Sequence, residues 1–284
     1  MKALDLRTQD VLAGSQKGWG DSMTILQTIS NFIKKTFVIV ELELKKLKHD
    51  PSEIITRAIQ PTLWLMVFGQ VFTRTRAIPT GDIPYIDFMA PGILCQSVLF
   101  ISIFFGITII WERDLGIVHK FLVSPAPREA LVLGKALSAG FRGLSQAVII
   151  FLLSLLLGVG VSWSPLSILG VLFAIVIGSA LFSTLSLIIA CLVKTRERLM
   201  GIGQLITMPL FFASNAIYPI QMMPEWLKYI AWGNPLTYLV DATRSMMLVK
   251  YQSQFGLTLD FAILLAVLIV FIFIGGRLYP KVVN

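Results

Sequence analysis

The sequence predicts an all-α integral membrane protein with six transmembrane helices. Of its 284 residues, 56% are hydrophobic and 14% are charged, whereas an average soluble domain has roughly 45–50% and 25%. The mean hydropathy is +0.79. The apolar residues gather into six runs, each long enough at about 1.5 Å per residue to cross a hydrocarbon core of roughly 30 Å. Together these observations exclude an ordinary soluble protein.

The predicted spans lie within one transmembrane unit, residues 54–284, which follows an N-terminal segment, residues 1–53, expected in the cytoplasm. Six spans leave mostly short connections, so we expect any soluble catalytic domain to be on another chain. The spans are Ile54–Phe72, Met89–Trp111, Leu137–Gly160, Pro165–Val193, Leu199–Tyr218 and Leu257–Gly276.

The distribution of Lys and Arg predicts the orientation of the spans. With the N-terminus inside, the short inner loops and the C-terminal segment hold nine Lys and Arg residues, against five in the outer connections. Because cytoplasmic loops carry an excess of these residues, both termini are expected in the cytoplasm. The protein itself is expected in a plasma membrane or bacterial inner membrane. The same rule explains the formal net charge of +8, which therefore does not indicate a nucleic-acid partner.

An amphipathic helix is predicted before the first span. Apolar residues, among them Phe32 and Phe37, recur three and four positions apart, and most of the charged residues, including Lys45, fall elsewhere around the helix. The pair Asp50-Pro51 marks its end, since proline disfavours helical geometry in the residue before it. We expect this basic helix to lie in the inner membrane interface. The alternative is a soluble helix that binds a partner or forms a coiled coil.

The loop after the second span predicts a short helix parallel to the membrane. It opens with three charged residues at the membrane boundary, Glu112, Arg113 and Asp114, and ends at the proline-rich stretch 124–127. A free loop needs no apolar face, so the pattern indicates burial in the interface or docking against another protein. The apolar face of this run is made by Leu115, Val118, Phe121 and Leu122.

The outer connection from Pro219 to Gly256 predicts a helical hairpin that dips into the outer leaflet. Trp226 is on the apolar face of the first short helix, and Asn234-Pro235 makes the turn. The backbone groups of a hairpin are satisfied within its two helices, as lipid requires. Asp241 and Arg244, three residues apart on the second helix, are positioned to form an ion pair. Interfacial aromatic residues such as Trp226 more often anchor a protein in the membrane than contact a ligand.

The sequence lacks the motifs that catalysis or ion coupling requires. No GxxxxGK[ST] phosphate loop occurs, and His49 and His119 lack the neighbours of a zinc site. A proton- or sodium-driven carrier would place a charge in the middle of a span, and none is found there. Arg57 and Arg142 lie near inner span ends, where their side chains are expected to snorkel to the interface. We therefore expect no enzyme, no metal ion and no cofactor on this chain.

Four stretches, taken in their order and spacing, resemble the membrane permease subunit of type-2 ABC exporters. The segment PEWLKYIAWGNPLTYLVDATR from Pro224 is most similar to the drug and lipo-oligosaccharide branch of that family. The stretches are QPTLWLMVFGQVF from Gln60, YIDFMAPGIL from Tyr85, ERDLGIVHKFLVSPAPREALVLGK from Glu112 and NPLTYLVDATRSMML from Asn234.

The resemblance implies a role for each unusual segment. The amphipathic helix becomes the interface helix, residues 114–123 the coupling helix, and residues 219–249 a re-entrant outer element, with Trp226, Asn234, Pro235, Asp241 and Arg244 as its characteristic residues. It also implies a separate nucleotide-binding ATPase that holds ATP and magnesium, and a second permease, for which we favour an identical copy. The permease itself is then non-catalytic and moves an amphipathic drug-like, lipid or glycolipid substrate out of the cytoplasm or inner leaflet.

We expect the segment from Glu112 to Phe121 to couple the permease to its ATPase. Charged groups at a helix end can pair across a partner interface and fix its register. The alternative for these charges is that they only end the span in water. For the whole chain, the alternative is a membrane scaffold or lipid-modifying protein that transports nothing itself. The residues assigned to coupling are Glu112, Arg113, Asp114, Leu115, Gly116, Val118 and Phe121.

Overall fold

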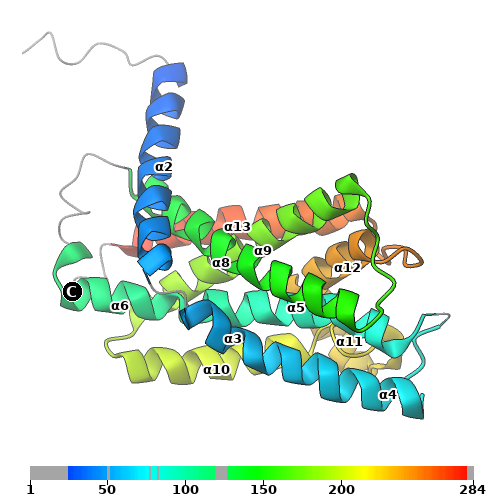
Figure 1. Cartoon of the computed structure of the whole chain (residues 1–284). Helices are drawn as coiled ribbons and strands as arrows, with labels where there is room; N and C mark the ends of the chain where they lie inside the picture. The colour runs from blue at the N-terminus through cyan, green and yellow to red at the C-terminus, as the bar shows by residue number, and fades with distance from the viewer. Residues whose placement is uncertain (1–24, 50–51, 77, 82, 119–126, 280–284) are drawn as a thin grey trace, which may run out of the picture.

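The computed structural model describes residues 25–49, 52–76, 78–81, 83–118 and 127–279, and these residues confirm the all-α prediction (Figure 1). Apart from turns and loops, the described chain departs from helix only in an isolated bridge between Val161 and Leu248. The elements are α2 (Ile25–His49), α3 (Ser52–Leu63), the π-helix η1 (Trp64–Gly69), α4 (Gln70–Thr75), α5 (Tyr85–Phe104), α6 (Gly106–Asp114), α8 (Arg128–Leu156), α9 (Pro165–Leu192), α10 (Arg196–Phe212), the 3₁₀ helix η2 (Ile220–Met222), α11 (Glu225–Gly233), α12 (Pro235–Met247) and α13 (Leu257–Leu278).

Within the described residues, four helical segments are long and apolar enough to cross a membrane: α5 with α6, α8, α9 and α13. They correspond to the predicted second, third, fourth and sixth spans. The predicted first span is divided, because a π-helix separates α3 from α4 shortly after Pro61, which cannot donate a helical hydrogen bond. The predicted fifth span is α10, which is shorter than expected: it ends at Phe212, where the Ala213 N–H closes on the Pro209 carbonyl.

Two helices begin or end away from the predicted boundaries. α8 starts at Arg128, directly after Pro127 and well before the predicted Leu137, and this earlier part of the helix packs on α2. The helical run that was expected at Met89–Trp111 extends from Tyr85 to Asp114. Its added last turn contains all three charged residues that were expected to follow the span.

Helix α9 is the centre of the bundle, where it packs against α8, α13, α5 and α12. Figure 1 shows α2 standing across the direction of the longer helices at one end of the molecule, with α11 and α12 at the opposite end. We call these the α2 end and the α12 end. α2 approaches α8 closely at Gly134, where a Cβ atom would lie 2.6 Å from Cβ of Ile39.

One close backbone contact at the α12 end gives a first prediction. A Cβ atom at Gly92 of α5 would lie 2.1 Å from the Ala216 carbonyl oxygen. Gly92→Ala is therefore expected to lower the free energy of unfolding by about 1–3 kcal/mol through overpacking. Thermal unfolding of the purified protein in detergent measures this.

Gly201→Ala on α10 is the matched control, because nothing lies within 4 Å of a Cβ atom there. Alanine favours a helix over glycine, so this variant is expected to unfold at the same temperature as the wild type or slightly higher. Equal behaviour of the two variants would contradict the contact.

Candidate functional site

The candidate site is the last turn of α6, where Glu112, Arg113 and Asp114 follow one another. α6 ends at Asp114, and the chain turns at Leu115 and Gly116, the latter with φ +70°. Helical geometry resumes at Ile117. The predicted coupling helix over 114–123 is thus corrected at its start, because Asp114 belongs to α6 and a left-handed glycine separates the two segments.

The apolar face predicted for the segment after α6 is described only at its beginning. Leu115 is 69% exposed, whereas Val118 is fully buried in a cluster with Ile109 and Ile110. Phe121 lies outside the described residues. Leu115 therefore faces outward, and Val118 packs against the rest of the protein.

Glu112 is directed into the protein and is 3% exposed. Its Oε2 lies 2.5 Å from Nζ of Lys135 on α8, and the same ammonium lies 3.4 Å from Oε1 of Glu43 on α2. A guanidinium nitrogen of Arg142 lies 4.0 Å from the other oxygen of Glu43. These four residues, Glu43, Glu112, Lys135 and Arg142, form what we call the buried charge cluster.

The buried charge cluster holds two carboxylates and two basic groups, so its formal charges balance. Burying a charge is costly unless it is paired and hydrogen-bonded, and each of these side chains has an opposite charge beside it. Arg142 also lies over the Phe105 ring, with its guanidinium carbon 4.7 Å from the ring centroid. The snorkelling expected of Arg142 is wrong: its side chain is buried and faces Glu43. The side chain of Arg57 lies outside the described residues.

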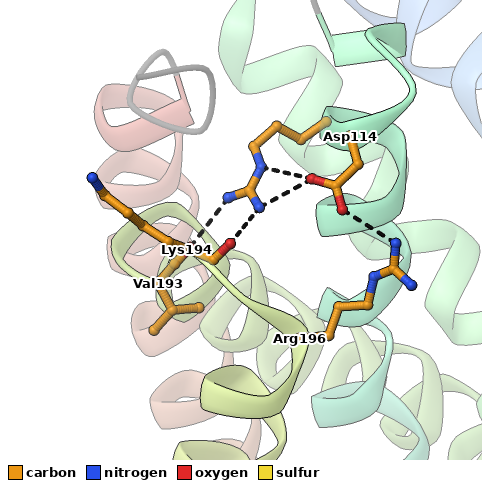
Figure 2. Close-up of polar contacts among 5 residues, drawn as sticks. Asp114, Val193, Lys194 and Arg196 are labelled. Carbon is orange, nitrogen blue, oxygen red and sulfur yellow. Dashed lines mark hydrogen bonds and ion pairs between the residues drawn. The ribbon is translucent and has the colours of Figure 1, made fainter.

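Arg113 and Asp114 connect α6 to the segment between α9 and α10 (Figure 2). Arg113 donates to the carbonyl oxygens of Lys194 at 2.6 Å and Val193 at 3.3 Å. Asp114 accepts from Arg113 at 3.1 Å and from Arg196 at 3.2 Å. Arg196 thus holds α6 from the first residue of α10. The alternative that these charges only end the span in water does not describe Arg113, whose guanidinium is committed to protein groups.

The predicted apolar face of α2 is divided between two environments. Thr36, Ile39, Val40 and Glu43 are buried, and three of them, Thr36, Ile39 and Glu43, lie against α8. Phe37 is 65% exposed, and Phe32 is half-buried. Lys45 lies on the exposed side, where its ammonium is 2.8 Å from Glu41. The hydrogen bond from Lys45 and its positive charge lower the pKa of Glu41 below its ordinary value of 4.5.

At the α12 end, Asn234 joins two helices. Its side-chain oxygen accepts from the Leu236 N–H at 2.9 Å and so caps α12, whose first residue is Pro235. Its side-chain nitrogen donates to the carbonyl oxygens of Leu210 and Ala213 at 2.7 and 3.0 Å. Asn234, the predicted turn residue, thus also binds backbone carbonyl groups at the end of α10.

The ion pair expected between Asp241 and Arg244 is wrong: among the described residues, no ion pair joins them. Arg244 is fully buried and donates to the carbonyl oxygens of Phe88 at 3.1 Å and Asn215 at 2.7 Å. Asp241 accepts from the backbone N–H of Gln254 at 2.8 Å and from other groups of the loop before α13. Each charge thus holds a different segment to α12. Trp226 on α11 is 65% exposed.

Comparison with known proteins matches residues 34–248 to the model of the family described as ABC-2 type transporter. The chain belongs to this family. Among its relatives are the putative transport permease ycf38 of Cyanophora paradoxa (29% identical over 89% of this chain and 90% of the relative), the daunorubicin resistance ABC transporter permease protein DrrB1 of Streptomyces coeruleorubidus (24%, 70% of each) and nodulation protein J of Sinorhizobium fredii (23%, 74% and 80%).

The ABC-2 permease is therefore a multi-pass membrane protein and the non-catalytic transmembrane subunit of an exporter. The family implies a nucleotide-binding ATPase as its partner. The three charged residues of α6 and the buried charge cluster are all within the matched range.

The buried charge cluster gives a second prediction. Lys135→Met leaves two buried carboxylates facing one guanidinium, so we expect the permease to lose about 3–5 kcal/mol of stability. Adding Glu112→Gln restores the charge balance and is expected to recover part of the loss. A double-mutant cycle on thermal unfolding in detergent measures both effects.

Lys45→Met is the control for removing a lysine from an exposed ion pair, and we expect it to change stability little. If Lys135→Met is no more destabilising than Lys45→Met, or if Glu112→Gln adds to the loss, the cluster does not stabilise the permease.

Proposed function

We propose that this permease has six spans, formed by the four candidate spans together with the segment Ser52–Thr75 and α10. Ser52–Thr75 is continuously helical over 24 residues, which extend roughly 36 Å at about 1.5 Å per residue. It lies alongside α5 from the α2 end to the α12 end (Figure 1). A row of its apolar residues is at least half exposed, which supports contact with lipid or a second permease: Ile59, Leu63, Val67 and Val71.

The α2 end is proposed to be cytoplasmic and the α12 end to be external. Residues 1–53 then form a cytoplasmic segment, and α2 lies along the inner surface as the interface helix, with Phe37 towards lipid and Lys45 towards the head groups. Its orientation across the longer helices supports this arrangement (Figure 1). α11 and α12 form the re-entrant outer element, anchored by Trp226.

We propose that ATP-driven closure of the partner ATPase is transmitted through the last turn of α6. One observation carries this proposal: consecutive residues of that turn contact three other segments and reach a fourth through Lys135. Glu112 reaches α8 and, through Lys135, α2, while Arg113 and Asp114 reach the α9–α10 connection and α10. A push on the segment after Gly116 therefore reaches several helices at once and tilts them together.

The proposed assembly is a homodimer of permeases with two ATPases, and the substrate is an amphipathic drug-like, lipid or glycolipid molecule. One relative confers daunorubicin resistance by its printed name, which supports a hydrophobic cargo with polar groups. The proposed path lies between two permeases and opens outward at the α12 end.

The coupling role gives a third prediction. Arg113→Ala with Asp114→Ala removes the contacts to the α9–α10 connection but leaves the buried charge cluster in place. In liposomes containing the permease with its ATPase, we expect substrate-stimulated ATP hydrolysis and transport to fall roughly fivefold or more, while membrane insertion and basal hydrolysis stay unchanged.

Glu225→Ala with Lys228→Ala removes an exposed ion pair of 2.7 Å at the α12 end and is the matched control. It is expected to leave stimulated hydrolysis near the wild-type value. Normal stimulation in the Arg113 and Asp114 variant would contradict the coupling assignment, and a complete absence of ATPase association would contradict the exporter function.

A further inference from the structure

A pocket of about 210 Å³ lies between α3 and α5. Its polar lining is made of amide and hydroxyl groups, and aromatic side chains complete the wall. Gln96 lies near the middle of the helical run Tyr85–Asp114, and so at the depth of the membrane interior. The lining residues that matter here are Thr56, Gln60, Gln96, Ser97, Phe100 and Phe104.

Gln96 is the unusual member of this lining. It is 3% exposed, and its side-chain oxygen has no hydrogen-bond partner among the described residues. The hydroxyl of its neighbour Ser97 is committed to the Ile93 carbonyl at 2.8 Å. A buried amide oxygen without a partner is costly in apolar surroundings, and such groups in native proteins call for an explanation. A hydrogen-bond donor that enters the pocket would supply the missing partner.

A second, larger hollow of about 530 Å³ adjoins the pocket and shares Thr56 and Gln60 with it. The rest of its lining is apolar and aromatic, and it includes Trp64 and Phe68 of the π-helix η1, whose rings stack with centroids 4.6 Å apart. π-helical turns are frequent at functional sites. Amide groups and an apolar wall are thus next to each other on one face of the molecule.

We propose that the two hollows together bind a neutral amphiphile, with its hydroxyl- or amide-bearing head group at Gln96 and Gln60 and its apolar part along Trp64 and Phe68. This inference rests on the proposed function, because it names the substrate class of the exporter. The described lining residues of both hollows include no ionisable side chain. None of these side chains supplies a counter-charge for a charged head group, whereas the Gln96 oxygen accepts from a hydroxyl or amide donor, so we expect neutral head groups to be preferred.

Photoaffinity labelling of the full-length permease in lipid nanodiscs tests the site. The probe is decyl glucoside with a diazirine in its alkyl chain, and the comparison probes are decyl sulfate and decyl trimethylammonium with the same diazirine. Peptide mass spectrometry is expected to find the glucoside probe on residues of α3, η1 and α5. The two charged probes are expected to label these segments several times less.

Gln96→Leu removes the amide at nearly the same volume and is expected to raise the half-saturating glucoside concentration about tenfold. Gln60→Leu, on an exposed position that packing does not restrict, is expected to weaken labelling in the same direction. Gln70→Leu on α4 removes an exposed amide outside both hollows and is the matched control. Labelling unaffected by both Gln96→Leu and Gln60→Leu, or equal labelling by the charged probes, overturns the inference.

The same preparation separates this inference from the proposed function. The Arg113 and Asp114 variant is expected to bind the glucoside probe like the wild type while losing stimulated hydrolysis. Absent labelling with intact coupling overturns the amphiphile site alone. Labelling at α3 and α5 in a permease that recruits no ATPase supports the amphiphile site and contradicts the exporter function.

Discussion

The buried charge cluster constrains the rest of the α2 end. Glu43, Lys135, Glu112 and Arg142 come from three helices, and each carries a charge that the apolar interior tolerates only beside its opposite. Separating α6 from α8, or α2 from α8, would leave one of these charges in apolar surroundings without an opposite charge beside it. Breaking any one of these pairs therefore leaves a buried charge without its partner, which disfavours displacement of one of the three helices relative to the others.

The α12 end is also held by polar groups, but in a different way. There Arg244 and Asn234 donate to backbone carbonyl oxygens of α5, α10 and the loop after α10. These side chains therefore bind backbone groups rather than other charged side chains. Between the two ends, helices meet mainly through apolar contacts. In that middle layer, the side-chain oxygen of Gln96 has no hydrogen-bond partner among the described residues, and this is the observation on which the proposed ligand site rests.

Hydropathy and periodicity predicted the helices well because both are local properties of the chain. The same properties could not predict which helices touch. Lys135 meets Glu43 from 92 positions away, and Arg244 meets Phe88 from 156 positions away. Glu112 was expected to face a partner together with Arg113 and Asp114, yet it is directed inward. The available signals were Glu43 on the apolar side of an amphipathic helix and Gly134 directly before Lys135, which together indicate a helix packed closely over a buried lysine.

Helix geometry explains why three adjacent residues serve different contacts. Successive side chains on an α-helix are about 100° apart, so Glu112, Arg113 and Asp114 point in different directions from one turn. One direction leads to the buried charge cluster and the others to the α9–α10 connection and the start of α10. The chain then turns at once through Gly116, whose left-handed conformation ends the helix. In the proposed assembly, a force from the ATPase would act on a joint that contacts α8 on one side and the segment between α9 and α10 on the other, so it would displace whole helices instead of bending the end of one.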